Sequence, residues 1–503
     1  MSDLSNNETV NLLMDEYSSE FNYKMNETAI ILAAGHGKRI KSQTSKMLHQ
    51  IWGIPTVERV YNSCTKAING INIILVVGIK ATDVIKVIGK RANTVFTHQA
   101  EQLGTGHAVQ IGLEAIDSNK YDGIVYVYAG DMGLLDDKTV KMFGDKFKES
   151  NSDMMVLTGL YEGKPEENSY GRIIRVKEYD INGSYSGEDF GKVIEIIENK
   201  DIMKLPDDKP YVLQFGNKTF SYTKEELINN NEFNSGVYAF KYKYLVDLIQ
   251  NIENNNAQKE IYITDLIAIF NKQNLTVSAV SPKEQHVIMG FNDKSVLKEM
   301  ESIARKIAYK RLKNIIEIDD PDDFFIDETV IDDILEMDKK GIPLDIRVGK
   351  GVYIGKGAQL NYNLNLLKNV FISGNIIFGE NVHVWENVHL STFRHQKFVI
   401  GNNVEILWNN IIKGNIIIGN NSRIESSVNM TGSDDYPLII GNNVVIKGTS
   451  YIFGSIVDDD LFIEHSVLIN KKVNKLLKKD GTVLPIKFYL PMPEGIDVIE
   501  SLK

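Results

Sequence analysis

Two glycines and two positive charges follow a short apolar run near the start of the chain. The run TAIILAA (28–34) leads into Gly35 and Gly37, then Arg39, and Lys46 comes seven residues later. Glycine lets backbone N–H groups approach a phosphate closely, and the two cations can neutralise a triphosphate and the charge that develops in phosphoryl transfer. The spacing matches neither the Walker A loop nor the Rossmann fingerprint. Taken alone, the segment is equally well explained as a tight turn followed by surface cations.

Two further polar segments could take part in the same chemistry. Asp131 ends the apolar run GIVYVYAG (123–130), and a carboxylate there is costly unless it meets a metal ion or a cation. A helix cap or a loop salt bridge is the alternative. The stretch QAEQLGTGH (99–107) contains Gln99, whose amide offers both a donor and an acceptor. Its alternative is a polar turn in which Thr105 caps the next helix.

The elements that would position these side chains alternate between strands and helices. The segment 56–67 has helical spacing, and INIILVVG (71–78) is typical of a buried strand. Repeated β–α–β units predict an α/β fold with a mostly parallel, Rossmann-like sheet covered by helices on both faces. Ligands in such sheets bind outside the carboxyl ends of the strands, where both the glycine turn and Asp131 would lie.

Together these motifs resemble those of the sugar nucleotidyltransferases. L-A-A-G-x-G-x-R with a downstream lysine is similar to the signature of that family, and residues 99–107 resemble the uridine-reading loop of the bacterial UDP-N-acetylglucosamine pyrophosphorylases. Further segments resemble the rest of the site in those enzymes, and the resemblance covers about 28–295. They are YGRI (170–173), IENKD (197–201), EFNSG (232–236) and NNNAQKEIYITD (254–265).

The resemblance implies a role for each matching residue. It implies catalysis by Arg39 and Lys46; nucleotide binding by Leu32, Ala33, Gly35, Gln99, Gly104 and Thr105; sugar binding by Gly171, Glu198 and Asn234; and Mg²⁺ binding by Asp131 and Asn256. The implied reaction is transfer of UMP from UTP to N-acetylglucosamine 1-phosphate by in-line attack, with pyrophosphate leaving and no protein nucleophile. The alternatives are another sugar 1-phosphate, a bifunctional enzyme that also acetylates glucosamine 1-phosphate, and a non-catalytic sugar-nucleotide sensor.

The match departs from the family pattern at two loops. Ser45 stands where the family usually has proline before the lysine, and Met132-Gly133 follow Asp131 where x-Pro is usual. These changes could loosen both loops.

After about residue 340 a glycine–asparagine phrase recurs at a six-residue step. It appears at 376–384, 398–406, 416–424 and 438–446. This step is typical of a left-handed parallel β-helix with apolar residues inside and with Gly and Asn at turns that tolerate positive φ; a β-sandwich with glycine turns is the alternative. We expect interruptions at 361–370, 391–397 and 429–437.

The acetyltransferase motifs of the bifunctional relatives are not found in this half of the sequence. His395 and Lys413 fit no such spacing and are expected to be isolated surface residues. We therefore expect the β-helix to be mainly structural and to form a homo-oligomer, with the trimer of the relatives as the model.

The expected organisation is an N-terminal polar extension (1–27), a nucleotidyltransferase domain (28–292), a linker helix with an acidic connector (293–340), and the β-helix with a C-terminal tail (341–503). A net charge of −11 argues against nucleic-acid or membrane partners. The single cysteine, together with the lack of a signal-like start, predicts a cytoplasmic protein.

Overall fold

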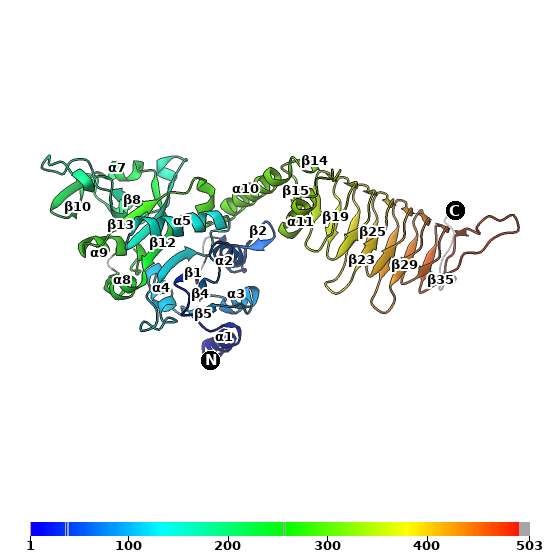
Figure 1. Ribbon diagram of the computed structural model, residues 1–503, viewed down its shortest axis with the longest axis horizontal. Helices are drawn as coiled ribbons and strands as arrows, with labels where there is room; N and C mark the ends of the chain where they lie inside the picture. Colours follow the sequence, from blue (N-terminus) through cyan, green and yellow to red (C-terminus); the bar gives the residue numbers. More distant parts are fainter. Residues whose placement is uncertain (1, 36, 38–39, 255, 257, 492–503) are drawn as a thin grey trace, which may run out of the picture. The chain divides into compact units, whose positions relative to one another are not determined.

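The computed structural model describes residues 2–35, 37, 40–254, 256 and 258–491, and its chain forms two compact units, residues 1–301 and 302–503. Figure 1 shows the elements of both units. In the first unit, strands and helices alternate along the chain, and the strands form one main sheet with helices packed on it. In the second, short strands repeat along the chain. None of the described helices is long and apolar enough to cross a membrane.

The first unit is built on a mixed, mostly parallel sheet, as predicted. Strand β12 runs antiparallel to β6, β7 and β8, and β8 runs antiparallel to β9, whereas the other pairings in the sheet are parallel. The strand order is β13 (Val277–Val280), β7 (Met154–Leu160), β12 (Glu232–Lys241), β6 (Ile124–Ala129), β1 (Glu27–Ala33), β4 (Asn72–Val77) and β5 (Thr94–His98), and β8 (Arg172–Arg175) pairs with β12 and with β9 (Val193–Ile197).

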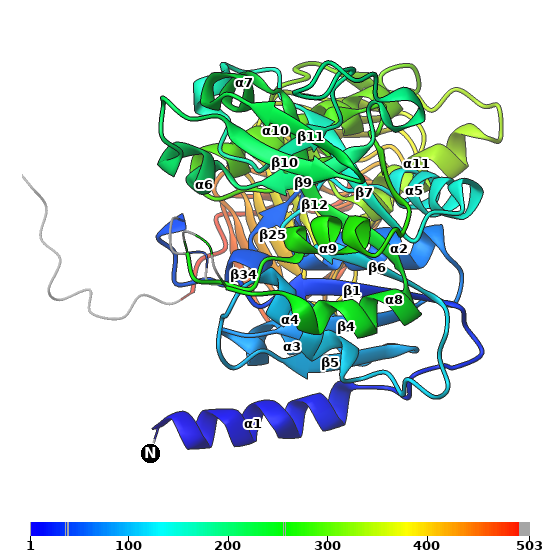
Figure 2. The same cartoon turned by 90° about the vertical axis from the view of Figure 1, so that its left-hand side faces the viewer.

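Helices cover both faces of this sheet, because successive side chains of a strand point to opposite faces. One core joins the sheet to α2 (Thr56–Ala67), α3 (Ala81–Ile88) and α5 (Asp137–Ser150). The other joins it to α4 (Thr105–Leu113), α8 (Tyr242–Leu248) and α9 (Leu266–Lys272), which lie together in front of the sheet in Figure 2. The predicted helix at 56–67 is α2.

The polar extension at the N-terminus is a helix, α1 (Ser2–Tyr17), that belongs to the first unit. Val10 is buried in the core shared with α2 and α3, and Leu13, Met14 and Tyr17 pack against it. After the helix, Ser19 N–H donates to the Thr94 carbonyl at 2.7 Å. The chain therefore covers the outer edge of β5, which would otherwise leave backbone groups unpaired.

The second unit is the predicted left-handed parallel β-helix, whose strands form three parallel sheets. One sheet contains β14 (Glu317–Ile318), β16 (Arg347–Val348), β18 (Leu364–Leu366), β21 (Val382–Val384), β24 (Glu405–Ile406), β27 (Arg423–Ile424), β30 (Val445–Lys447), β33 (Phe462–Glu464) and β36 (Ile486–Lys487). The second contains β15 (Phe324–Ile326), β17 (Val352–Ile354), β19 (Phe371–Ser373), β22 (His389–Ser391), β25 (Ile411–Gly414), β28 (Asn429–Gly432), β31 (Tyr451–Phe453) and β34 (Val467–Ile469). The third contains β20 (Ile376–Phe378), β23 (Phe398–Ile400), β26 (Ile416–Ile418), β29 (Leu438–Ile440), β32 (Ile456–Val457) and β35 (Lys472–Val473).

Glycine and asparagine have different roles at the turns of the β-helix. The asparagines adopt positive φ, as at Asn403 (56°) and Asn421 (56°). The preceding glycines serve a different purpose: a Cβ on Gly419 would lie 2.5 Å from the backbone of Gly441 in the next coil. Glycine is thus required by the close approach of the coils, and the expectation that both residue types supply positive φ holds only for asparagine in this phrase.

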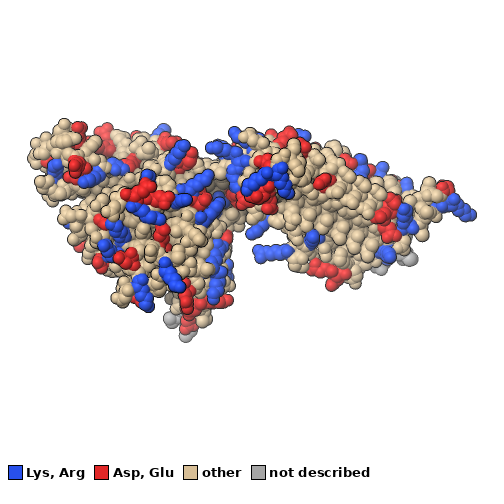
Figure 3. All heavy atoms as spheres, in the orientation of Figure 1, with Lys and Arg blue, Asp and Glu red and all other residues tan. Residues whose placement is uncertain are grey.

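The β-helix begins within the segment expected to be a connector. Strands β14 and β15 pair with β16 and β17, and Phe324 and Ile326 are buried. The run of acids around them hid this alternation in the sequence. Helix α10 (Lys294–Leu312) matches the predicted linker helix, and α11 (Glu328–Asp338) is inserted in the first coil. Charged side chains gather around these elements, whereas the face of the coils seen in Figure 3 is largely uncharged.

Two of the three expected interruptions are loops. They connect β22 to β23 and β28 to β29, and His395 Nε2 on the first lies 2.7 Å from Asp434 Oδ2 on the second, so His395 is not isolated. The expected interruption at 361–370 is wrong. Strand β18 lies there, and its Asn365 pairs with Arg347, 18 residues earlier, the length of three six-residue sides.

Candidate active site

Lys46 and Asp131 meet at the carboxyl edge of the sheet. Strands β1 and β6 are parallel neighbours, so the segments that follow them emerge at the same edge. Lys46 Nζ lies 2.5 Å from Asp131 Oδ2, and the two side chains are only 11% and 16% exposed. Lys46 also donates to Asn292 Oδ1 at 3.1 Å and lies 5.4 Å from the centre of the Phe291 ring. A cation and a carboxylate predicted from segments far apart in the sequence are thus in direct contact.

The glycine turn packs against the segment that carries Lys46. Gly37 has φ of 58°, and a Cβ there would lie 2.9 Å from Lys46 Cβ. A Cβ on Gly35 would reach Met47 at 3.4 Å. Leu32 and Ala33 form the end of β1. The turn and the lysine therefore form one surface, while Arg39 lies outside the described residues.

Neither departure from the family pattern leaves a loosely packed loop. Ser45 has φ of −54°, within the range to which a proline ring would restrict it, and ψ of 140°. Met132 is buried in the core, and a Cβ on Gly133 would lie 2.6 Å from Ile51 Cδ1. The Gly133 carbonyl also accepts a hydrogen bond of 2.6 Å from Arg59 Nε. Packing and this hydrogen bond hold the segment that follows Asp131.

The predicted nucleotide loop is fixed by the segment that carries Asn256. Gly104 has φ of 113°, and a Cβ there would lie 2.5 Å from the Ile261 carbonyl oxygen. Ile261 N–H donates to the Leu103 carbonyl at 2.7 Å, and Thr105 Oγ1 accepts from Ile263 N–H at 3.3 Å. Only a glycine fits at 104.

Gln99 and Thr105 use their side chains within the protein. Gln99 is buried, and its Nε2 lies 3.1 Å from both the Gly104 carbonyl and His107 Nδ1. Gln99 therefore fixes the shape of this loop. Thr105 is the first residue of α4, but Gly104 is its cap and no side chain caps the helix, so the alternative reading of Thr105 as the cap is wrong.

The three predicted sugar-binding residues lie together. Asn234 N–H donates to the Gly171 carbonyl at 2.9 Å, and a Cβ on Gly171 would lie 3.1 Å from Glu198 Oε1. Asn234 Oδ1 accepts from the Tyr238 hydroxyl at 2.9 Å. Its amide nitrogen has no hydrogen-bond partner within the part of the chain that the structure describes. This group therefore offers a carboxylate and an amide donor to a ligand.

Burial raises the pKa of Glu198 to about 7. The negative charges of Asp201 and Asp265 act in the same direction, and the positive charges of Lys200 and Arg172 oppose them. The protonated form therefore dominates below about pH 7. A carboxylate kept away from water in this way is typical of binding and catalytic sites.

Asp131 and Asn256 provide oxygen ligands of the kind that Mg²⁺ prefers. Asp131 Oδ2 contacts Lys46, and Asp131 Oδ1 has no hydrogen-bond partner among the described residues. Asn256 Oδ1 accepts two weak hydrogen bonds of 3.2 Å, from the N–H groups of Gln258 and Glu260. A carboxylate and an amide oxygen, completed by phosphate and water oxygens, suit this hard octahedral ion. The donor types therefore fit the predicted metal.

Sequence reasoning missed three residues beside Lys46 and Asp131. Phe291 and Asn292 contact Lys46, as described above. Tyr170 stacks on Phe233 with ring centres 4.5 Å apart, and burial together with the charge of Asp131 raises its pKa to about 12. Tyr170 lies in the motif YGRI (170–173), but the resemblance implied no role for it. No local pattern marks Phe291 or Asn292, because their proximity to Lys46 depends on the return of the chain to this edge.

Comparisons with known proteins show which sequences this chain is similar to. Residues 29–170 match the family model of the MobA-like NTP transferase domain. The chain is 35% identical over 304 residues to the bifunctional protein GlmU of Acetivibrio thermocellus, covering 60% of this chain and 57% of that protein. It is 33% identical over 309 residues to the bifunctional protein GlmU of Clostridium tetani, covering 61% and 59%.

These alignments span less than two thirds of the length of either relative. A solved structure of UDP-glucose pyrophosphorylase with UDP-glucose covers 57% of this chain and 100% of its own, at 15% identity and a TM-score of 0.40. The sequence comparisons confirm the predicted resemblance: residues 29–170 match the model of the MobA-like NTP transferase domain, and about 60% of the chain is similar in sequence to the bifunctional GlmU proteins.

Proposed function

We propose that the chain transfers UMP from UTP to N-acetylglucosamine 1-phosphate, giving UDP-N-acetylglucosamine and pyrophosphate. The observation that supports this most directly is the contact between Lys46 and Asp131 beside the glycine turn, at the sheet edge where ligands bind in such folds. A non-catalytic sensor would have no need of this pair. The sequence similarity to bifunctional GlmU proteins favours the uridylyl reaction among nucleotidyl transfers.

In this mechanism the protein positions two anions and reduces their repulsion. The glycine turn would hold the triphosphate through backbone N–H groups, and Lys46 would move from Asp131 to the phosphates. Glu198 and Asn234 would hold the sugar so that its phosphate oxygen attacks the α-phosphorus in line with the leaving pyrophosphate. Asp131 and Asn256 would hold Mg²⁺, which when bound supplies positive charge to the phosphates. Arg39 would add a second cation.

A panel assay tests the substrate. Purified chain is mixed with UTP, Mg²⁺ and one of several sugar 1-phosphates, and pyrophosphate release is measured. We expect the highest kcat/KM with N-acetylglucosamine 1-phosphate, because the Asn234 side-chain amide can donate a hydrogen bond to the acetamido oxygen. Faster turnover with glucose 1-phosphate would overturn the sugar assignment, and the absence of pyrophosphate with every sugar would overturn the enzymatic one.

The pKa of Glu198 predicts a pH dependence of sugar binding. A carboxylate accepts a hydrogen bond from a sugar hydroxyl more strongly than a carboxylic acid does. With a pKa of about 7, roughly one tenth of Glu198 is ionised at pH 6 and nine tenths at pH 8. The KM for the sugar 1-phosphate should therefore fall about tenfold between pH 6 and pH 8.

The variant Glu198→Gln separates this effect from the titration of the substrate. The phosphate of the sugar 1-phosphate also titrates near pH 6, and the variant retains that contribution. We expect its KM to be higher at pH 8 and to vary much less with pH. An identical pH profile in the two proteins would rule out Glu198 as the titrating group.

The β-helix is proposed to be mainly a scaffold for self-association, with the protein acting in the cytoplasm. Its third sheet presents a column of aliphatic side chains in register toward the outside, including Ile417, which is 47% exposed, and Ile456, which is 43% exposed. Such a surface is suited to burial between copies of the chain. Light scattering on the full chain tests this, with a trimer as the expected state.

A further inference from the structure

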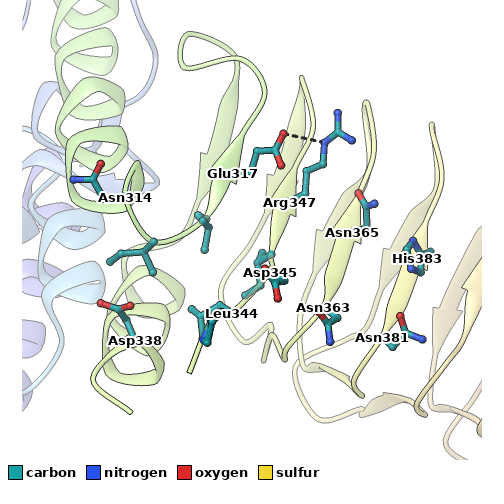
Figure 4. A pocket seen from close by; sticks show the side chains of 14 residues that line it. Asn314, Glu317, Asp338, Leu344, Asp345, Arg347, Asn363, Asn365, Asn381 and His383 are labelled. Atoms are coloured by element: carbon teal, nitrogen blue, oxygen red, sulfur yellow. Dashed lines mark ion pairs between the residues drawn. The ribbon is translucent and has the colours of Figure 1, made fainter. Parts of the chain in front are cut away.

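A pocket of about 670 Å³ lies on the first coils of the β-helix, far in sequence from the motifs of the proposed active site. This volume falls in the range of about 300–1,000 Å³ that is usual for small-molecule sites. In Figure 4, Arg347, Asn365 and His383 follow one another across neighbouring strands, and Asp345, Asn363 and Asn381 follow at the turns below them. Asn314 after α10 and Asp338 at the end of α11 close the side of the pocket.

The asparagine ladder of the β-helix stops at this pocket. Along one row of turns, each side chain donates to the next coil: Asn381 to Asn403 at 2.9 Å, Asn403 to Asn421 at 2.9 Å, Asn421 to Asn443 at 3.2 Å and Asn443 to Asp460 at 2.8 Å. Asp345 and Asn363 occupy the two preceding positions of the row, with φ of 48° and 55°. Neither makes a side-chain hydrogen bond to any described residue. Their hydrogen-bonding groups therefore remain available to a ligand.

The strand residues above this row of turns also lack side-chain partners at the pocket. Farther along the β-helix, Arg423 pairs with Glu405 at 2.8 Å. At the pocket, Asn365 and His383 are register neighbours without side-chain partners among the described residues, and Asn365 Oδ1 is buried without a hydrogen bond. A buried, unpaired amide oxygen costs free energy unless a ligand or water satisfies it.

An aromatic wall continues the pocket. A second hollow of about 260 Å³ shares Arg347, Asn365 and His383 and ends at Trp385. Trp385 is held by a hydrogen bond from its Nε1 to Glu405 Oε1 at 3.0 Å and by its contact with Trp408, with ring centres 4.9 Å apart. A fixed indole beside unpaired polar groups can pack against the apolar face of a sugar ring while its hydroxyls are hydrogen-bonded.

The charges of the lining decide the class of ligand. Glu317, Asp338 and Asp345 outnumber Arg347, whose charge is already met by Glu317 at 3.7 Å and Asp319 at 2.9 Å. Such a lining disfavours phosphates and other anions. Within the described residues there is also no group of three His, Cys, Asp or Glu placed to hold a metal ion. Carboxylates can, however, accept hydrogen bonds from several hydroxyl groups, and side-chain amides can both donate to and accept from them.

We propose that this pocket binds an uncharged saccharide, with Asp345, Asn363, Asn365 and His383 bonding its hydroxyls and Trp385 contacting its ring. The site is separate from the proposed uridylyl transfer and does not depend on it. No group transfer takes place there.

Isothermal titration of the full chain tests the proposal. The probes are glucose, galactose, mannose, N-acetylglucosamine and their disaccharides, compared with glucuronic acid as an anionic sugar. We expect at least one neutral saccharide to bind, and Asp345→Asn and Asn365→Leu each to weaken that binding about tenfold. Asp345→Asn retains a residue that tolerates positive φ, so the fold is preserved, and circular dichroism checks this.

Lys447→Ala is the control, because Lys447 lies on β30 of the same sheet as Arg347, three strands beyond β21, the last strand that lines the pocket. It should leave saccharide affinity unchanged. Saccharide binding that survives both pocket substitutions would locate the ligand elsewhere and overturn the proposal. Preferred binding of glucuronic acid, or no heat from any neutral saccharide at about 10 mM, would overturn it as well.

Discussion

Replacing Asp131 with alanine should lower kcat for pyrophosphate release by about 10³-fold or more. The change removes the carboxylate that lies 2.5 Å from Lys46 Nζ and one of the two proposed oxygen ligands of Mg²⁺. Lys46 would retain only Asn292 and the Phe291 ring to position it. Steady-state kinetics with UTP and N-acetylglucosamine 1-phosphate measure the effect, and circular dichroism confirms that the variant is folded.

Two further variants show whether the loss comes from this carboxylate. Asp131→Asn keeps an oxygen that can accept from Lys46 but removes the negative charge, so its kcat should fall between those of the alanine variant and the parent. Asp137→Ala removes an acid six residues later, whose contact with Lys66 is a weak 3.8 Å ion pair, and should leave kcat almost unchanged. A kcat of Asp131→Ala within tenfold of the parent would exclude this pair from the reaction.

Replacing Gly414 with alanine should strongly destabilise the β-helix. Gly414 has φ of 101°, and a Cβ there would lie 1.8 Å from the Gly432 carbonyl oxygen in the next coil. Backbone atoms of stacked coils cannot move apart without breaking the hydrogen bonds between β25 and β28. We expect a loss of about 3–5 kcal/mol and a fall of about 6–20 °C in the melting temperature of this unit.

Gly341→Ala is the matched control for this effect. Gly341 also has positive φ, 71°, but no atom lies within 4 Å of a Cβ built on it. Its substitution should cost about 1 kcal/mol, the penalty of the backbone conformation alone. Calorimetry resolves the transitions, and tryptophan emission identifies that of the β-helix, because two of the three tryptophans lie in it. Equal shifts for the two variants would show that contact between coils is unimportant at Gly414.

Local sequence patterns predicted individual helices and strands well, but they predicted poorly which segments pack into a core. The helical spacing of residues 56–67 gave α2 with its observed bounds, because the amphipathic period is a property of the segment itself. The first strands of the β-helix were missed, because a run of aspartates surrounds the buried Phe324 and Ile326. The polar composition of residues 1–27 predicts an extension, but Val10 and its apolar neighbours pack into the core of the first unit.

The amino-acid sequence alone determined the two fold classes, the positions of the turns and the chemical types of the candidate site residues. Strand alternation, the six-residue step and glycine or asparagine at turns depend on neighbours in the chain, so they can be read without a structure. Only the tertiary structure decided which of these side chains meet. Lys46 contacts Asp131, 85 residues away, and Asn292, 246 residues away, and the break in the asparagine ladder at Asn363 appears only when the coils are stacked. Such contacts depend on how the whole chain packs, and no local pattern encodes that.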